Sequence, residues 1–151
     1  MIKRLGTGTE GQARSVLLRV WRAIVEHRDA IRFDLPLPVY DTLAGPEREL
    51  YQITNKTIHG VTKDIESEFQ FNTVISKIRI MTNELSDNLP GDTPCPVFSH
   101  AIGVLLKLLA PIAPHMAEEL WQRLDGPGSI HAQAWPAVDP AALTAPMALP
   151  D

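Results

Sequence analysis

Two prolines three residues apart, Pro111 and Pro114, interrupt the most strongly helical stretch of this chain. Proline lacks the amide proton that a helix interior uses, so the helix that precedes Pro111 has to end near Leu109 or Ala110. Pro114 suits the first turn of a second helix, where that donor would be unused, and Gly126 is placed to stop this helix. The second helix has an apolar face, formed by Met116, Ala117, Leu120, Trp121 and Leu124. The sequence therefore predicts a sharp helical corner.

Helical periodicity extends the helix before Pro111 over residues 97–109 and predicts three more helices, over residues 11–31, 46–67 and 72–87. The apolar face of the first consists of Ala13, Val16, Leu17, Val20, Trp21, Ile24 and Ile31. Pro46 is placed to open the second helix, and Asn72 is a candidate N-cap for the third. No strand pattern and no internal repeat occur in the sequence. We therefore expect an all-α fold, a bundle of about five helices.

The length of 151 residues fits one domain. We divide it into a flexible or truncated stub at residues 1–10, a helical bundle at 11–136, and a disordered tail at 137–151 that is rich in alanine and proline. No apolar run approaches the roughly 20 residues of a membrane-spanning helix, and the amino terminus lacks the apolar region of a secretory signal. The single cysteine, Cys95, excludes an internal disulfide and suits the cytoplasm, where we expect a passive thiol.

Charge is distributed unevenly along the chain. Residues 1–32 carry seven basic and three acidic residues, a net charge of +4, whereas residues 33–151 carry seven basic and fifteen acidic residues, a net charge of −8. A basic stripe on an acidic body is typical of a protein that contacts phosphates with one face. It is also compatible with a helix that docks onto an acidic protein.

Within the basic region, Arg19 and Arg22 are three positions apart and fall on the outer side of the first helix. We expect them to contact nucleic-acid phosphates, with Arg14 as a weaker candidate and Lys77, on the outer side of the third helix, as the weakest. The alternative is an ordinary solvated face on which Arg22 and Glu26, four positions apart, form an ion pair. Trp21 falls on the apolar side, which favours a place in the core over a base-stacking role.

Residues for catalysis or metal binding are not spaced as either chemistry requires. His100, His115 and His131 are about fifteen positions apart on different elements, so they do not have the spacing of metal ligands. Glu118 and Glu119 are adjacent and point in different directions on a helix. The segment 57–60, Thr-Ile-His-Gly, lacks the second histidine of the His-x-Gly-His nucleotide signature and lies inside a helix. We expect no catalytic residue, metal ligand or cofactor-binding residue in this chain.

The corner itself, LAPIAPHMAEELW at residues 109–121, is followed by Gly-Ser-Ile-His at 128–131 and Ala-Trp-Pro at 134–136. This combination resembles the end of the anticodon-binding helical bundle of bacterial-type leucyl-tRNA synthetases. Arg-Val-Trp-Arg at 19–22 and Phe-Asn-Thr at 71–73 resemble earlier parts of the same bundle, so the resemblance covers roughly residues 11–140. Valyl and isoleucyl relatives share the proline break and Glu-Glu-Leu-Trp, but His115 and the segment 129–131 favour the leucyl family.

One departure concerns the first helix. The family more often has Arg-Phe-Leu where this chain has Ser15, Val16 and Leu17, which leaves open whether Arg14 replaces that arginine.

The resemblance implies a tRNA-binding module, like the anticodon-binding domain of class I aminoacyl-tRNA synthetases. In that family the bundle positions tRNA for leucylation by a separate catalytic domain, which uses ATP and magnesium. We expect neither that catalytic domain nor a binding site for ATP or magnesium in this chain. The expected partners are a leucine tRNA and that catalytic domain, with no membrane. Three alternatives stay open: a stand-alone or degenerate protein-interaction bundle, a fragment active only with the missing domains, and the same module from a valyl or isoleucyl relative.

Overall fold

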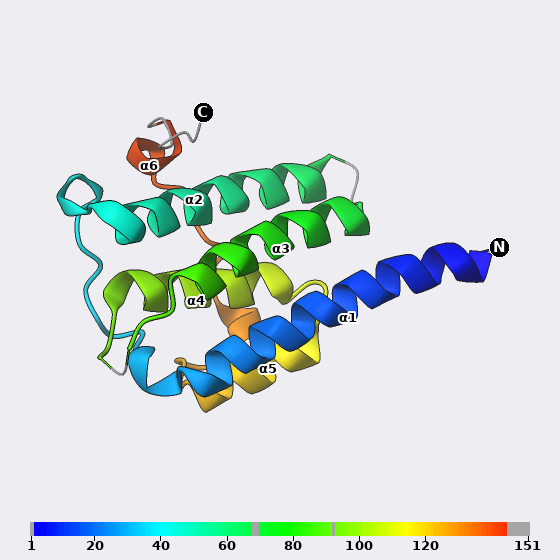
Figure 1. Ribbon diagram of the computed structural model, residues 1–151, viewed down its shortest axis with the longest axis horizontal. Coiled ribbons are helices and arrows are strands. Elements are labelled where there is room, and N and C mark those ends of the chain that lie inside the picture. The colour runs from blue at the N-terminus through cyan, green and yellow to red at the C-terminus, as the bar shows by residue number, and fades with distance from the viewer. Residues whose placement is uncertain (1, 68–69, 92, 145–151) are drawn as a thin grey trace.

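The computed structural model describes the backbone of residues 2–67, 70–91 and 93–144, and the side chains of residues 11–67, 70–91 and 93–143. Within these residues the fold is a helical bundle without strands, as predicted (Figure 1). Three short 3-10 turns, Arg28–Ala30, Tyr40–Thr42 and Ile130–Ala132, connect the helices. The described α-helices are α1 (Ile2–Glu26), α2 (Gly45–Glu66), α3 (Phe71–Asp87), α4 (Pro96–Leu109), α5 (Pro114–Arg123) and α6 (Pro140–Thr144).

Both ends of α1 differ from the sequence prediction. The helix begins at Ile2 rather than near Gly11, and its first turns project beyond the rest of the bundle (Figure 1). It ends at Glu26 rather than Ile31, because distant residues bind the backbone that follows. The Cys95 amide donates to the Ala30 carbonyl at 3.1 Å, and the Arg32 amide donates to Ser99 Oγ at 2.9 Å. These tertiary hydrogen bonds hold residues 30–32 against α4 instead of in a continued helix.

Helices α2 and α3 lie side by side and pack on α4, which forms the buried centre of the bundle (Figure 1). The largest fully buried side chains include Ile58, Ile75, Ile78, Met81, Phe98, Ile102, Leu105 and Leu106.

The prediction of Asn72 as an N-cap is wrong. The cap of α3 is Gln70, whose carbonyl accepts hydrogen bonds from the Val74 amide at 3.2 Å and the Thr73 hydroxyl at 2.9 Å. The helix therefore starts at Phe71, before Asn72, and the side chain of its cap residue makes no capping hydrogen bond.

The proline corner forms where the sequence predicts it. Helix α4 ends at Leu109, whose carbonyl accepts the Ala113 amide at 2.7 Å, and α5 then begins at Pro114. After α5, Asp125 takes a positive φ of 60° and the Gly126 amide donates to the Trp121 carbonyl at 2.9 Å. A Cβ atom at Gly126 would lie 2.2 Å from Trp121 Cε2, so only glycine fits where the chain folds back over this indole.

Residues 137–143, expected to belong to a disordered tail, pack against α2. The Asp139 amide donates to Asn55 Oδ1 at 2.8 Å, and Asp139 Oδ2 accepts the Tyr51 hydroxyl at 2.8 Å. Asp139 Oδ1 also accepts the Ala141 amide at 3.1 Å at the start of α6, and Ala142 is fully buried. Asp139 followed by Pro140 is a typical helix start, but the alanine- and proline-rich composition of this segment led to the prediction of disorder instead. Residues 145–151 of the expected tail lie outside the described residues.

Candidate nucleic-acid interface

Three arginines share one face of α1. Arg14, Arg19 and Arg22 line a surface hollow of about 350 Å³ together with Ser15 and Leu18. The opposite face of the same helix consists of buried residues, namely Ala13, Val16, Val20 and Ile24. Burial of this apolar face fixes the direction of the arginines, which we call the arginine ridge. Arg14 and Arg22 are exposed and Arg19 is partly exposed.

The ridge arginines make no ion pair with any residue whose side chain the structure describes. In particular, the Arg22–Glu26 pair that the sequence allowed does not form within 4.0 Å, although both side chains are exposed. A guanidinium presents five donors in a planar fork that matches phosphate oxygens in pairs. Three such groups, without acidic partners in the described region, form a surface suited to a chain of phosphates.

Lys77 lies apart from this hollow and is already engaged. Its Nζ is 2.7 Å from Asp64 Oδ2, which joins α3 to α2. The lysine stem crosses Gly60, where an added Cβ atom would lie 2.8 Å from Lys77 Cδ. The absence of a side chain at Gly60 therefore makes room for the Lys77 stem between α2 and α3. Because a carboxylate already pairs with Lys77, we rank it below the three arginines as a candidate for contact with phosphates.

Trp21 is partly buried and packs against the core, in agreement with the prediction. It lines a second, more apolar hollow of about 370 Å³ with Leu18, Phe71 and Met116. Arg123 of α5 lies over its ring, with Cζ 5.1 Å from the centroid. This contact adds a fourth arginine beside α1. Sequence reasoning missed it because Arg123 lies on α5 and reaches Trp21 only through helix packing.

The Glu118 carboxylate holds the loop that follows α5. Its Oε1 accepts the Ser129 hydroxyl and the Ile130 amide, each at 2.9 Å, and its Oε2 accepts Gln122 Nε2 at 2.6 Å. The hydrogen bonds from Gln122 and Ser129 lower the pKa of Glu118 below its ordinary value. Glu118 and the Gly-Ser-Ile-His segment, separate in sequence, thus form one structural unit, which stabilises the corner beside α1.

The remaining candidates for chemistry lie on different elements. His100, His115 and His131 belong to α4, α5 and the turn Ile130–Ala132, and no group of three metal-ligand types forms in the described residues. The Cys95 thiol lies 3.6 Å from Glu47 Oε2, and burial raises its pKa, which disfavours the reactive thiolate. No described helix has the length and apolar character needed to cross a lipid bilayer.

Comparison with known proteins places this bundle in a family. Residues 47–149 match the family model described as the anticodon-binding domain of tRNA ligase. The chain is 42% identical over 136 residues to a leucine–tRNA ligase of Nostoc punctiforme, covering 90% of this chain and 15% of that protein. It is 41% identical over 140 residues to the leucine–tRNA ligase of Thermosynechococcus vestitus, with the same coverage of both. The chain thus spans less than one-sixth of the length of either relative.

A solved structure has the same fold. It is the ternary complex of a LeuRS with tRNA and LeuAMS from Agrobacterium radiobacter K84, with a TM-score of 0.75 and 32% sequence identity. The similarity covers 87% of this chain and 17% of that one. The family match extends from the first turn of α2 through the proline corner, and the structural similarity covers most of the bundle. The chain belongs to the family of anticodon-binding domains of tRNA ligases.

Proposed function

We propose that this chain is the tRNA-binding module of a leucyl-tRNA synthetase and binds a leucine tRNA through the arginine ridge. The catalytic domain of the parent synthetase carries out the ATP- and magnesium-dependent leucylation, for which the module positions the tRNA. The observation that carries the proposal is the set of three arginines on one face of α1, without acidic partners in the described region. The similarity to leucine–tRNA ligases, and to a LeuRS in complex with tRNA, supports the identity of the nucleic acid.

The ridge provides affinity and orientation rather than sequence readout. Arginine contacts to phosphate oxygens fix the register of a nucleic acid but carry no base information. Each neutralised phosphate releases counterions, with a salt slope of about −0.7 to −0.9 per contact. With three such contacts, raising the salt concentration from 50 to 200 mM should therefore lower the affinity by about 20- to 40-fold. The proposed ridge thus predicts marked salt sensitivity in a chain whose net charge is −4.

The direct test reverses two ridge charges in the variant Arg19→Glu/Arg22→Glu. We expect binding of a leucine tRNA transcript to weaken by at least about tenfold at low salt, with a salt slope smaller by about two. Fluorescence anisotropy measures both quantities, while circular dichroism checks that helicity is unchanged. The matched control, Lys63→Glu/Arg79→Glu, changes the net charge equally at two exposed residues of α2 and α3 outside the ridge.

The two double variants separate the ridge from overall charge. Equal weakening in both would assign binding to net charge and refute the ridge. Unchanged tRNA binding in the ridge variant would refute it as well. Because phosphate contacts are independent of sequence, the ridge variant should weaken leucine and valine tRNAs by the same factor.

Two further experiments test the wider assignment. Adding a separately expressed catalytic half and measuring leucylation tests the role of the module, and restored leucine transfer is the expected result. A chain that ignores tRNA but co-purifies with an acidic protein would instead be the protein-interaction bundle that the charge distribution allowed. The proposed location is the cytoplasm, where the single cysteine remains reduced.

A further inference from the structure

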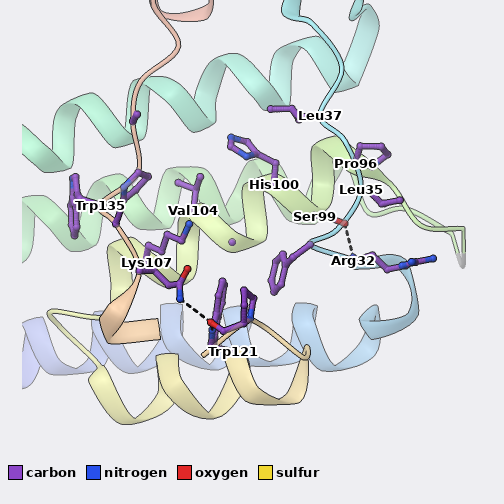
Figure 2. A pocket seen from close by; sticks show the side chains of 17 residues that line it. Arg32, Leu35, Leu37, Pro96, Ser99, His100, Val104, Lys107, Trp121 and Trp135 are labelled. Atoms are coloured by element: carbon purple, nitrogen blue, oxygen red, sulfur yellow. Dashed lines mark hydrogen bonds between the residues drawn. The ribbon is translucent and has the colours of Figure 1, made fainter. Parts of the chain in front are cut away.

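A cavity of about 480 Å³ opens on the side of α4 (Figure 2). It lies between the connection 32–37 and the segment 133–137, which are about a hundred residues apart in sequence. Helix α4 contributes His100, Val104 and Lys107, whose spacing of four and three residues puts them on one face. Its size falls within the roughly 300–1,000 Å³ of small-molecule sites. The cavity belongs to neither the arginine ridge nor the hollow around Trp21.

Aromatic side chains form the apolar part of the wall. Phe33 stacks on Trp121, with ring centroids 4.8 Å apart and an interplanar angle of 24°. Phe33 comes this close to α4 because Gly103 has no side chain, and a Cβ atom there would lie 3.3 Å from Phe33 Cε1. Trp135 lines the opposite side and is fixed by a hydrogen bond from its Nε1 to Thr62 Oγ1 at 2.8 Å. The cavity therefore offers preformed aromatic surface.

The ionisable groups of the cavity lining are all basic. Within the described part of the chain, its lining contains Arg32, His100 and Lys107 but no aspartate or glutamate. Arg32 is paired with Asp34 at 2.7 Å, whereas Lys107 is half-buried and makes no ion pair with a described residue. Burial lowers the pKa of Lys107, and no described carboxylate forms an ion pair with it. A half-buried ammonium without an acidic partner is costly unless a bound anion neutralises it.

The charges on neighbouring elements agree with this picture. Burial, and after it the charge of Lys107, lower the pKa of His100, while Asp139 raises it. Asp139 accepts the Tyr51 hydroxyl and the Ala141 amide and is not part of the cavity lining. Asp139 is therefore engaged elsewhere, and Asp34, beside the cavity, is paired with Arg32, which leaves the charge of Lys107 without a carboxylate partner among the described residues.

We propose that this cavity is a binding site for a small aromatic carboxylate, whose anionic group pairs with Lys107 Nζ and whose ring lies against Phe33 and Trp135. Neither the arginine ridge nor tRNA takes part in this site. An aromatic ring fits the flat walls, and a single negative charge matches Lys107, whose Nζ lies 5.8 Å from the centroid of the Trp121 ring and has no carboxylate partner among the described residues. The Gln133 amide, which donates to the Pro127 carbonyl at 2.8 Å, holds the segment that closes the cavity.

The test uses the full 151-residue chain and three probes: 2-naphthoate, its neutral analogue 2-naphthamide, and acetate. The indole N–H signals in ¹H–¹⁵N NMR spectra provide the readout, because Trp121 and Trp135 line the cavity and Trp21 does not. We expect saturable shifts of the Trp121 and Trp135 signals with 2-naphthoate, while the Trp21 signal stays in place. Acetate and 2-naphthamide should bind at least about tenfold more weakly, because each lacks one of the two interactions.

The variant Lys107→Met keeps a side chain about as long as the lysine stem and removes the charged ammonium group. We expect it to weaken 2-naphthoate binding at least about tenfold and to leave 2-naphthamide binding unchanged. Lys63→Met, at an exposed lysine of α2, is the matched control and should bind both probes as the unaltered chain does. The proposal is overturned if 2-naphthoate gives no saturable shift, if Trp21 shifts equally, or if Lys107→Met binds 2-naphthoate normally. Equal affinity for 2-naphthamide would also overturn it.

Discussion

Replacing Asp139 tests whether the segment after residue 136 belongs to the folded unit. This carboxylate accepts the Tyr51 hydroxyl at 2.8 Å and the Ala141 amide at 3.1 Å, and Tyr51 is only 5% exposed. A hydrogen bond to a charged acceptor contributes about 1.5–3 kcal/mol, and a helix N-cap contributes about 1 kcal/mol. Because α6 is short and can detach as a unit, we expect Asp139→Ala to cost about 2 kcal/mol rather than the sum.

The assay is thermal denaturation followed by tryptophan fluorescence. A loss of about 2 kcal/mol corresponds to a decrease in Tm of about 4–8 °C for a chain of this size. Asp139→Asn keeps an oxygen for one of the two hydrogen bonds and should lose less stability. Asp87→Ala, at an exposed aspartate of α3, is the matched control and should change stability by less than about 0.5 kcal/mol.

Tyr51 provides a second, independent readout of the same contact. Burial, the hydrogen bond to Asp139 and the charge of Asp139 raise its pKa to about 12. The folded pKa lies above the unfolded one, so stability is full below about pH 10 and falls as the pH rises through 12. In Asp139→Asn the phenol should ionise at lower pH in an absorbance titration. Unchanged stability and unchanged Tyr51 ionisation would show that residues 137–143 do not dock in solution, which refutes this reasoning.

Two further predictions concern the corner. Gly126→Ala places a Cβ atom 2.2 Å from Trp121 Cε2 and should lower the free energy of unfolding by about 2 kcal/mol or more. A lower Tm and a changed fluorescence maximum of the folded variant would report this loss, whereas a Tm equal to that of the wild type would contradict it. The pKa of Glu118 lies below its ordinary value of 4.5 because Gln122 and Ser129 donate to it, so its stabilising effect is full above that pH and disappears as acid protonates it. The stability difference between the wild type and Glu118→Gln should therefore shrink as the pH falls below about 4.5; a difference that stays the same from pH 4.5 down to pH 3 would exclude this role.

Local sequence signals predicted most of the fold. Pro111 and Pro114 determine where α4 ends and α5 begins, because a missing amide proton has the same effect in any tertiary setting. Helical periodicity likewise separated the buried face of α1 from the arginine ridge, since both follow from 3.6 residues per turn. The resemblance to leucyl-tRNA synthetases rested on the same short-range pattern, and the family match confirms the domain type.

Long-range contacts decided what periodicity could not. Ile31 leaves the helical path because Cys95 and Ser99 bind the backbone beside it, about seventy residues away in sequence. Residues 137–143, which look structureless in the sequence, pack on α2 because Asp139 accepts a hydrogen bond from Tyr51. Lys77 is held by Asp64, and Arg123 lies over Trp21, only because the helices pack at particular angles.

The sequence by itself thus determined the helices, the corner and the direction of the arginine ridge, all of which depend on neighbouring residues. Only the tertiary structure decided which charges stay unpaired and where a cavity opens beside Lys107. The physical reason is distance along the chain. A helix is specified by contacts three and four residues apart, whereas an ion pair between helices or a cavity wall depends on how separate elements of the chain meet in space.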